Sequence, residues 1–290
     1  MTKSVLITGS SSGFGKAAAR KFREQGWRVA ATMRNPSRWQ EVEDPNLLLL
    51  PLDVSNPESV TAAVDQAIAK WGKIDCVVNN AGQAVVSVLE TTPIEVAKQI
   101  FDTNLFGVIR VMQKVLPHFR AVGGGRFVNL GSSSAIAPEP LMSVYSASKF
   151  AAEGLAEAAR YELAAFNITV KLVEPGFVKE TNILASTLEN AKAAPVPLAY
   201  RQYYDRMISD FLGEMPYRFA TEVDVAAAIV AAASDETGRF RFVVGEDAEA
   251  SAHMRRATSE PVYDAWAHGK YTGHFVEAAQ HYWSLRDQRS

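Results

Sequence analysis

The stretch that decides the fold is Ser4-Val5-Leu6-Ile7-Thr8-Gly9-Ser10-Ser11-Ser12-Gly13-Phe14-Gly15, which runs directly into Lys16–Gln25. Its apolar, β-branched start predicts a strand, its glycines predict a tight turn, and Lys16–Gln25 has the pattern of a helix. This order aims free backbone N–H groups at a phosphate. A P-loop is excluded, because the glycine spacing differs and Ala17 stands where that motif needs Ser or Thr.

The G-x-x-x-G-x-G spacing instead suits a pyrophosphate lying across the N-terminus of the helix. The alternative is an ordinary glycine-rich turn between a strand and a helix. The candidate ligand-binding residues of the turn are Gly9, Ser11, Ser12, Gly13, Phe14 and Gly15.

Composition narrows the class of protein. The chain has 290 residues, of which 48% are hydrophobic, so it can build a substantial core. A net charge of -2 gives no reason to expect nucleic acid or an anionic membrane as a partner. No apolar run is long enough to span a bilayer, and the chain enters a strand pattern at once without a signal peptide, so we expect a cytoplasmic protein. The single cysteine, Cys76, lies in an apolar stretch and is expected to be a buried structural thiol.

Strand and helix patterns alternate about seven times along the chain. This predicts an α/β fold, a Rossmann-type doubly wound parallel sheet of about seven strands with helices on both faces, and a single domain over residues 1–290. The run Leu47–Leu52 predicts a strand buried on both faces, and Pro93–Ala121 predicts one long helix that contains Asn104. The predicted strands are Ser4–Thr8, Arg28–Met33, Leu47–Leu52, Asp75–Val78, Arg126–Leu130, Ile168–Glu174 and Arg239–Val244.

The notable residues lie at the ends of these strands, where ligands of such sheets bind. The second strand ends at Arg34, and no carboxylate follows before Glu41 to accept a hydrogen bond from an adenosine ribose 2′-OH. Arg34, with Arg38 and Ser11, is suited to a 2′-phosphate through charge-assisted hydrogen bonds. The sequence therefore favours NADP(H) over NAD(H), and the alternative is a solvated cation at the strand end.

Tyr145-Ser146-Ala147-Ser148-Lys149 lies near the start of a predicted helix, Val144–Phe166. Residues four apart share a helix face, so the Tyr145 phenol and the Lys149 ammonium are expected side by side. A nearby ammonium favours the phenolate and lowers the phenol pKa from its usual value of about 10 towards the range of an efficient general acid. A surface tyrosine beside a solvated lysine is the alternative reading of this motif alone.

Two later segments differ in character from the rest of the chain. Residues 179–218 are rich in aromatic side chains and prolines and are expected to form a helical flap, a lid over an apolar ligand. The alternative is an excursion that packs on its own body or on a second subunit. The tail of residues 249–290 is also aromatic and is expected to dock on the body or on a partner.

Together these motifs make a specific pattern. They are Thr8-Gly9-x-x-x-Gly13-x-Gly15, Asn79-Asn80-Ala81-Gly82, Asn104, Ser132, Tyr145-x-x-x-Lys149 and Pro175-Gly176. With them, the chain resembles the short-chain dehydrogenase/reductase family from about Val5 to Gly176, and more loosely through Ala248. The resemblance implies that Tyr145 is the acid/base, that Ser132 polarises the carbonyl, and that Lys149 binds the nicotinamide ribose and tunes Tyr145.

The resemblance implies further roles around the cofactor. Asn104 would hold a water that links Lys149 to solvent. The adenine would be bordered by Asp53 and Val54, and its ribose by Asn80 and Ala81. The remaining expected cofactor contacts are Gly82, Pro175, Gly176 and Val178. Ser133 and Ser134 are the alternatives to Ser132. Family members often carry a threonine five residues after the proline of the Pro-Gly pair, where this chain has Glu180, so a nicotinamide contact by Thr181 is open.

The resulting hypothesis is an NADP(H)-dependent oxidoreductase (EC 1.1.1.-) that interconverts carbonyls and secondary alcohols. The strand end at Arg34, the flap and the Val244–Ala248 segment look similar to branches related to 17β-hydroxysteroid dehydrogenases and carbonyl reductases, which implies a bulky apolar substrate. The family usually forms homodimers or homotetramers. The alternatives are a non-catalytic NADP(H)-binding regulator and, less favoured, a serine hydrolase using Ser132 and one of the downstream His253, His268 and His274. The histidines show no metal-ligand spacing.

Overall fold

The computed structural model describes residues 2–39, 44–179, 187, 194–213 and 217–272. Within them, seven strands form one sheet in the order β3-β2-β1-β4-β5-β6-β7, and every neighbouring pair is parallel. The strands are β1 Ser4–Ile7, β2 Arg28–Met33, β3 Leu47–Pro51, β4 Cys76–Asn79, β5 Gly125–Leu130, β6 Ile168–Pro175 and β7 Arg241–Val244. This confirms the predicted Rossmann-type doubly wound sheet.

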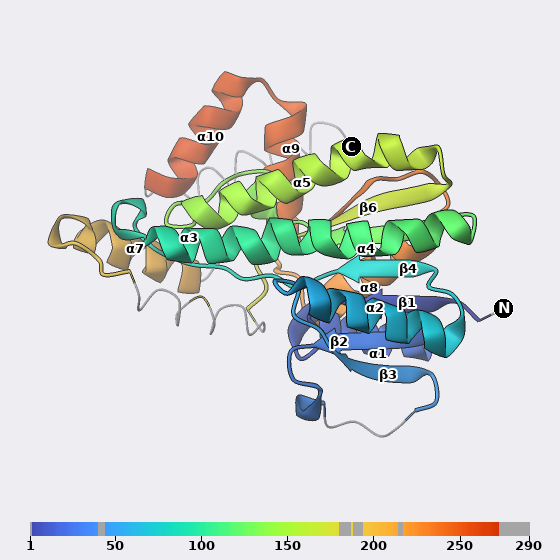
Figure 1. Cartoon of the computed structure of the whole chain (residues 1–290). Coiled ribbons are helices and arrows are strands. Elements are labelled where there is room, and N and C mark those ends of the chain that lie inside the picture. Colours follow the sequence, from blue (N-terminus) through green and yellow to red (C-terminus); the bar gives the residue numbers. More distant parts are fainter. Residues whose placement is uncertain (1, 40–43, 180–186, 188–193, 214–216, 273–290) are drawn as a thin grey trace.

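Helices cover both faces of the sheet, because parallel neighbours need a crossover connection between them. In Figure 1, α2, α4 and α5 lie in front of the sheet, and α1 and α8 lie behind it. Their bounds are α1 Gly13–Glu24, α2 Pro57–Trp71, α4 Gly107–Ala121, α5 Ser143–Ala164 and α8 Glu222–Ser234. No helix among the described residues is both long and apolar enough to cross a membrane.

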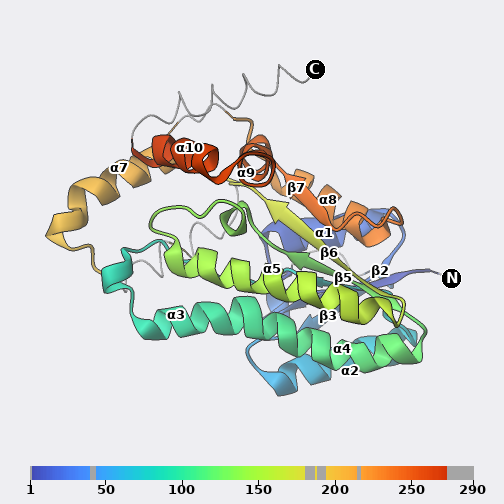
Figure 2. The same ribbon diagram turned by 90° about the horizontal axis from the view of Figure 1, so that it is seen from above.

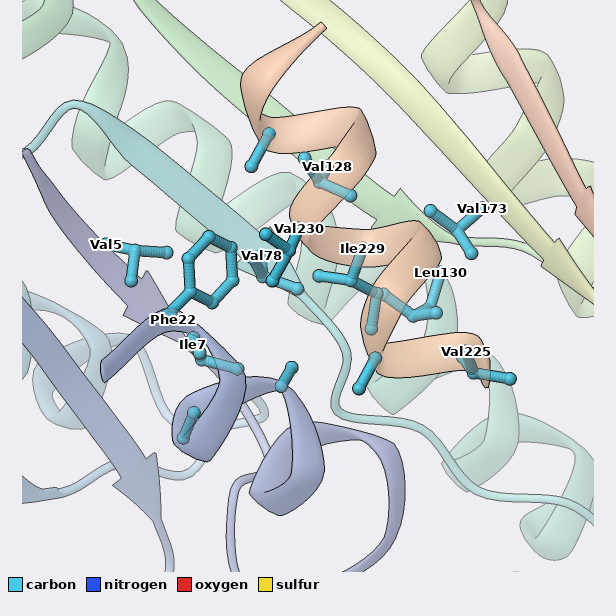
Figure 3. Close-up of a cluster of buried hydrophobic side chains, with 14 of the residues drawn as sticks. Val5, Ile7, Phe22, Val78, Val128, Leu130, Val173, Val225, Ile229 and Val230 are labelled. Carbon is cyan, nitrogen blue, oxygen red and sulfur yellow. The ribbon is translucent and has the colours of Figure 1, made fainter. Parts of the chain in front are cut away.

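The core has two layers, one on each side of the sheet. Side chains of a strand alternate between faces, so Val5 and Ile7 of β1 point to the layer beneath α1 and α8, while Leu6 points to the layer beneath α2, α4 and α5. Figure 3 shows the first layer, where Phe22 of α1 meets Val5 and Ile229 of α8 lies over the strands. Phe22 is fully buried, which stabilises the fold by about 2 kcal/mol.

The prediction that Leu47–Leu52 is buried on both faces is wrong. These residues form most of β3, which is an edge strand paired only with β2. Leu47, Leu48 and Leu49 are half-buried and Pro51 is exposed. An edge position leaves one row of backbone groups without a strand partner, and there a terminal proline removes no ladder hydrogen bond.

The predicted long helix over Pro93–Ala121 is interrupted. It consists of α3 Ile94–Phe101, a π-helical turn η3 at Asp102–Phe106, and α4. The Gly107 N–H donates to the carbonyl of Asp102, five residues earlier, instead of four. Such turns insert one extra residue into a helix and often mark functional sites. Here the inserted turn contains Asn104.

The C-terminal helices gather beside the carboxyl ends of β5 and β6, as Figure 2 shows. They are α7 Arg201–Leu212, α9 Glu246–Ala257 and α10 Glu260–Thr272. Two apolar clusters hold them there. The C-terminal cluster consists of Ala137, Tyr217, Ala250, Met254, Tyr263 and Trp266. The flap cluster consists of Val86, Val88, Leu141 and Met207, with Met142, Val196, Tyr204, Ile208 and Tyr271 partly buried against them.

The tail is therefore docked on the body as far as Thr272, in agreement with the expectation from its aromatic content. Tyr263 and Trp266 are both buried. Residues 273–290 and most of 180–193 lie outside the described residues, so the lid function of the flap stays a prediction. Cys76 is buried, and burial raises the pKa of its thiol to about 12, in agreement with a structural role.

Candidate active site

The turn between β1 and α1 is packed tightly against the end of β4. Gly9 has a φ of +71°, and a Cβ on it would lie 2.9 Å from Ala81 Cα. A Cβ on Gly15 would collide with the Gly9 carbonyl and with the Asn80 side chain. Only glycine fits at both positions. The result is a turn of bare backbone at the N-terminus of α1, which is the geometry that a pyrophosphate needs.

A network of neutral hydrogen bonds fixes this turn to β4. Thr8 Oγ1 accepts hydrogen bonds from the backbone N–H groups of Asn80 and Ala81, both at 3.0 Å. Asn80 Nδ2 donates to the carbonyls of Thr8 at 2.8 Å and Gly9 at 3.0 Å. The Asn80 side chain is therefore used to hold the turn. Thr8 carries as much of this network as Asn80, although the sequence marked it only as part of the glycine motif.

The predicted 2′-phosphate residues lie at the outer end of this region. Arg34 is exposed just after β2, and its positive charge reaches Asp53 at the end of β3. Burial raises the pKa of the Asp53 carboxyl, but hydrogen bonds from Ser55 and the charge of Arg34 outweigh burial and hold it below its ordinary value. Ser11 is half-buried, and Ser12 is the N-cap residue of α1 but makes no side-chain capping bond.

Ser132, Tyr145 and Lys149 come together at the ends of β5 and α5. The Ser132 hydroxyl is hydrogen-bonded to the Tyr145 phenol, and Ser132 Oγ also accepts from the Ser134 N–H at 3.1 Å. One helical turn after Tyr145, Lys149 Nζ lies 5.8 Å from the centroid of the phenol ring and donates to the Leu130 carbonyl at 2.8 Å. All three predicted residues are buried. Their convergence is the central feature of the site.

The expected depression of the Tyr145 pKa is not seen. Burial raises the pKa of Tyr145 to about 12, and the hydrogen bond from Ser132 opposes that rise only in part. The negative charges of Glu139 and Glu153 raise it further. Burial also lowers the pKa of Lys149 to about 8. Desolvation disfavours the charged form of both groups, and this effect outweighs the stabilisation of a phenolate that helix spacing alone predicts.

Asn104 is held by the loop that follows β4. Its Oδ1 accepts from the Gln83 N–H at 2.8 Å, and its Nδ2 donates to the Gln83 carbonyl and to Ser148 Oγ, both at 2.9 Å. A Cβ on the neighbouring Gly82 would lie 3.4 Å from Asn104 Oδ1 and 3.8 Å from Lys149 Nζ. The amide thus joins the β4 loop to α5 beside Lys149. The role of Asn104 in holding a water stays a prediction.

The Pro175–Val178 segment closes the site on the side of β6. The Phe177 N–H donates to Asp247 Oδ2 at 2.7 Å, and a Cβ on Gly176 would collide with the same carboxylate. Burial raises the pKa of Asp247 to about 6. Val178 is buried beneath the segment. The sequence analysis included Asp247 only within the Val244–Ala248 segment and gave it no role. Thr181 lies outside the described residues.

Buried charges behind Ser132 were also not predicted. Glu153 Oε1 accepts from the Ser132 N–H at 3.3 Å, and Arg241 Nη1 donates to Glu153 Oε2 and Glu174 Oε1, both at 2.6 Å. Arg256 of α9 also bonds Glu174. Burial and the neighbouring Glu174 raise the pKa of Glu153 to about 7.

A signal for this cluster was present in the sequence. Glu153 follows Lys149 by one helical turn, and Glu174 is an acid inside an apolar strand. An acid in either place needs a buried partner. Nothing in the sequence identifies Arg241 as that partner.

The described residues contain no group of three or more His, Cys, Asp or Glu side chains able to hold a metal ion. Among the described residues, the Ser132 hydroxyl contacts the Ser134 amide and the Tyr145 phenol, and the Ser132 N–H donates to the Glu153 carboxylate. His274 of the hydrolase alternative lies outside the described residues. These partners suit a hydroxyl that positions a substrate oxygen beside a phenol.

The turn between β1 and α1 exposes glycine backbone at the N-terminus of α1. It lies where the strand order reverses, between β1 and β4. This arrangement is that of a dinucleotide-binding fold. The short chain dehydrogenase family profile matches residues 3–192. The uncharacterized oxidoreductase YusZ of Bacillus subtilis is 37% identical over 216 residues, which are 71% of this chain and 76% of that protein. A 3-ketodihydrosphingosine reductase of Bacteroides thetaiotaomicron is 39% identical over 191 residues, 64% of this chain and 70% of that protein.

Solved structures agree with this match. A short-chain dehydrogenase from Streptomyces avermitilis superposes with a TM-score of 0.78 at 28% identity, over 92% of this chain and 96% of that one. The chain therefore belongs to the short-chain dehydrogenase/reductase family, a family of oxidoreductases.

Proposed function

We propose that this protein is an NADP(H)-dependent oxidoreductase that reduces a ketone to a secondary alcohol and catalyses the reverse reaction, with Tyr145 as the acid/base. The observation that carries the proposal is the buried Ser132–Tyr145 hydrogen bond with Lys149 one turn further along α5. A family of oxidoreductases supplies the reaction class.

The roles follow from the contacts. NADPH held by the glycine turn and Lys149 would supply the hydride that the carbonyl carbon gains, leaving NADP⁺. Tyr145 gives its phenol proton to the carbonyl oxygen. With a pKa of about 12, the phenol holds that proton at neutral pH, as reduction requires. Ser132 donates to the same oxygen and meets the negative charge that develops there. Lys149 orients the nicotinamide ribose from its position beside the Leu130 carbonyl.

The bare turn at Gly9 and Gly15 fits a pyrophosphate, and the exposed Arg34 supports a preference for NADP(H). Solved relatives carry either cofactor, because a 3-ketoacyl-(acyl-carrier-protein) reductase of Brucella melitensis is complexed with NADH and ElxO has NADP bound. Comparing kcat/KM for NADPH and NADH in wild type and Arg34→Ala tests this part. Loss of the NADPH preference in the variant supports it, and an unchanged ratio contradicts it.

A bulky apolar substrate is supported by the flap cluster, which places Leu141 and Met142 of the loop before Tyr145 against Met207 of α7. The name of the Bacteroides relative, 3-ketodihydrosphingosine reductase, denotes a reductase of a ketone. A panel of aldehydes, small ketones and long-chain or polycyclic ketones tests the size preference.

A homo-oligomer is proposed from the outer faces of α4 and α5, which lie side by side in Figure 2. Phe106 just before α4, Phe150 and Tyr161 of α5, and Phe166 just after it are exposed. Single exposed apolar residues are ordinary, but four of them on neighbouring elements support an interface between copies of the chain. Sedimentation of wild type against Phe106→Glu tests it.

The decisive experiment is Tyr145→Phe, followed by loss of NADPH absorbance with a ketone that the wild type reduces. Removing the general acid is expected to lower kcat by about 1000-fold, while NADPH binding is retained. Tyr161→Phe, on the exposed face of the same helix, is the matched control. Near wild-type turnover in Tyr145→Phe would end the proposal. NADPH binding without turnover of any ketone by the wild type would favour the regulator alternative.

A further inference from the structure

Glu139 is the only charged residue between Ser132 and Tyr145. Its loop is otherwise apolar in its packing. Two residues before it, Ala137 belongs to the C-terminal cluster, and two residues after it, Leu141 belongs to the flap cluster. Glu139 itself is half-buried. A carboxylate in such surroundings is costly unless something compensates its charge.

The Glu139 carboxylate reaches the reacting groups through one residue. Glu139 Oε2 accepts from Ser134 Oγ at 2.9 Å, and the Ser134 N–H donates to Ser132 Oγ at 3.1 Å. The charge of Glu139 also raises the pKa of Tyr145 and the pKa of Tyr271, a member of the flap cluster. The carboxylate therefore acts electrostatically on both the phenol and a member of the flap cluster.

This position works against the proton transfer. A negative charge beside Tyr145 opposes formation of the phenolate, and the proposed mechanism makes no use of it. The described residues include no salt bridge to Glu139. A basic group whose charge reaches the same region is Lys270, which lies over the Trp266 and Tyr271 rings at 5.3 and 5.2 Å.

The backbone holds Glu139 where it is. Leu141 has a φ of 63°, a conformation that is strained for a non-glycine residue. Its carbonyl accepts from the Ser87 N–H at 2.8 Å, and the Met142 N–H donates to the Glu139 carbonyl at 3.3 Å. The fold therefore keeps both a strained turn and an acid next to the phenol. Such features cluster where a site is shaped for a ligand.

We propose that Glu139 binds a protonated amine that the substrate carries close to its reacting carbonyl, while an alkyl chain of the same substrate packs on the flap cluster. The proposal rests on the proposed ketone reduction and adds the chemical class of the ketone. The ammonium would neutralise the Glu139 charge, which hinders ionisation of Tyr145. A substrate with the amine would therefore gain in binding and in proton transfer together.

The test compares two substrates that differ only in the amine: a long-chain α-amino ketone, at a pH where its amine is protonated, and the same ketone without the amino group. For wild type we expect kcat/KM to favour the amino ketone by about 10- to 100-fold, the range of a hydrogen bond to a charged group. Glu139→Gln keeps an acceptor for Ser134 Oγ and removes the charge. It should abolish the preference by slowing the amino ketone and not the neutral one.

Ser134→Ala is the matched control, because it removes the hydrogen bond to Glu139 and leaves the charge, so the preference should persist. An equal loss for both ketones in Glu139→Gln would show that the acid only braces the loop and would overturn the proposal. Equal reduction of both ketones by the wild type would also overturn the proposal, and it would leave the proposed ketone reductase function intact.

Calorimetry of the two corresponding alcohols with wild type and Glu139→Gln, in the presence of NADP⁺, makes the same comparison without turnover. Tighter binding of the amino alcohol by wild type alone supports the proposal. Equal affinities overturn it, even if the reaction itself proves to be different.

Discussion

The two halves of the site are held together by different kinds of contact. Around the ends of β1 and β4 the contacts are neutral: Thr8 Oγ1 and the Asn80 amide bond backbone groups at 2.8–3.0 Å. Around β5, β6 and β7 they are charged, with Arg241 between Glu153 and Glu174 and with Lys149 buried nearby. The first half would carry the cofactor phosphates and the second the reacting groups.

The two halves of the site are expected to respond differently to pH. Neutral hydrogen bonds do not titrate between pH 5 and pH 9, so the glycine turn should keep its shape throughout. The charged half contains Glu153 with a pKa of about 7 and Lys149 with a pKa of about 8. Its electrostatics therefore change between pH 5 and pH 9.

The largest expected effect comes from breaking the charged half with Arg241→Met. Glu153 and Glu174 would then be buried without their shared partner, which we expect to lower the free energy of unfolding by about 3 kcal/mol at pH 8. The loss should be smaller at pH 5, because Glu153 then takes up a proton and no longer needs a counter-charge. Urea denaturation at both pH values measures it.

The double variant Arg241→Met, Glu153→Met serves as the control for that prediction, because Glu174 keeps its bond to Arg256 whereas the salt bridge of Glu153 among the described residues is the one to Arg241. Removing one uncompensated acid together with the arginine should restore part of the stability. A single variant that loses the same stability at pH 5 and pH 8, and a double variant that recovers none, would mean that Arg241 acts through packing alone.

A smaller effect is expected from breaking the neutral half with Thr8→Val. The Ala81 N–H would lose its acceptor and the Asn80 N–H one of its two. We expect a loss of about 2 kcal/mol that is the same at pH 5 and pH 8. Thr8→Ser keeps the hydroxyl and should retain most of the stability. A loss in Thr8→Val that changes with pH would contradict the division into a neutral and a charged half.

The same division explains how far the sequence alone could lead. The glycine turn, the parallel sheet and the meeting of Ser132, Tyr145 and Lys149 were predictable, because strand ends of a parallel sheet converge and helix spacing is regular. The pKa of Tyr145 was not, since it depends on burial, which spacing does not report. The partnership of Arg241 with Glu153, 88 residues apart, also had no local signal.

The edge position of β3 and the π-helical turn at Asp102–Phe106 were missed for related reasons. An apolar run such as Leu47–Leu52 looks alike in a central and an edge strand, and only the sheet order separates them. One extra residue in a helix leaves the hydrophobic period nearly unchanged over a 29-residue pattern such as 93–121. The edge position of β3 depends on strands that are distant in sequence.

The smallest expected effect is that of Glu153→Gln on the pH dependence of activity, and it tests the charged half most directly. Burial places the pKa of Lys149 below its ordinary value, so its proton is present below about pH 8 and lost as pH rises. The negative charge of Glu153 raises the pKa of Lys149 and also that of Tyr145. In Glu153→Gln both pKa values should fall, and both groups would lose their protons at lower pH than in wild type.

The measurement is kcat/KM for ketone reduction as a function of pH, where the alkaline limb of Glu153→Gln should move down by about one pH unit. Glu157→Gln is the matched control, because Glu157 also bonds Arg241 but lies half-exposed one turn further along α5. The alkaline limb of Glu157→Gln should match that of wild type. If the limb of Glu153→Gln stays in place or moves up, Glu153 does not set the charge state of the reacting groups. Its contact with the Ser132 N–H would then be structural, and the charged half would differ from the neutral half in stability alone.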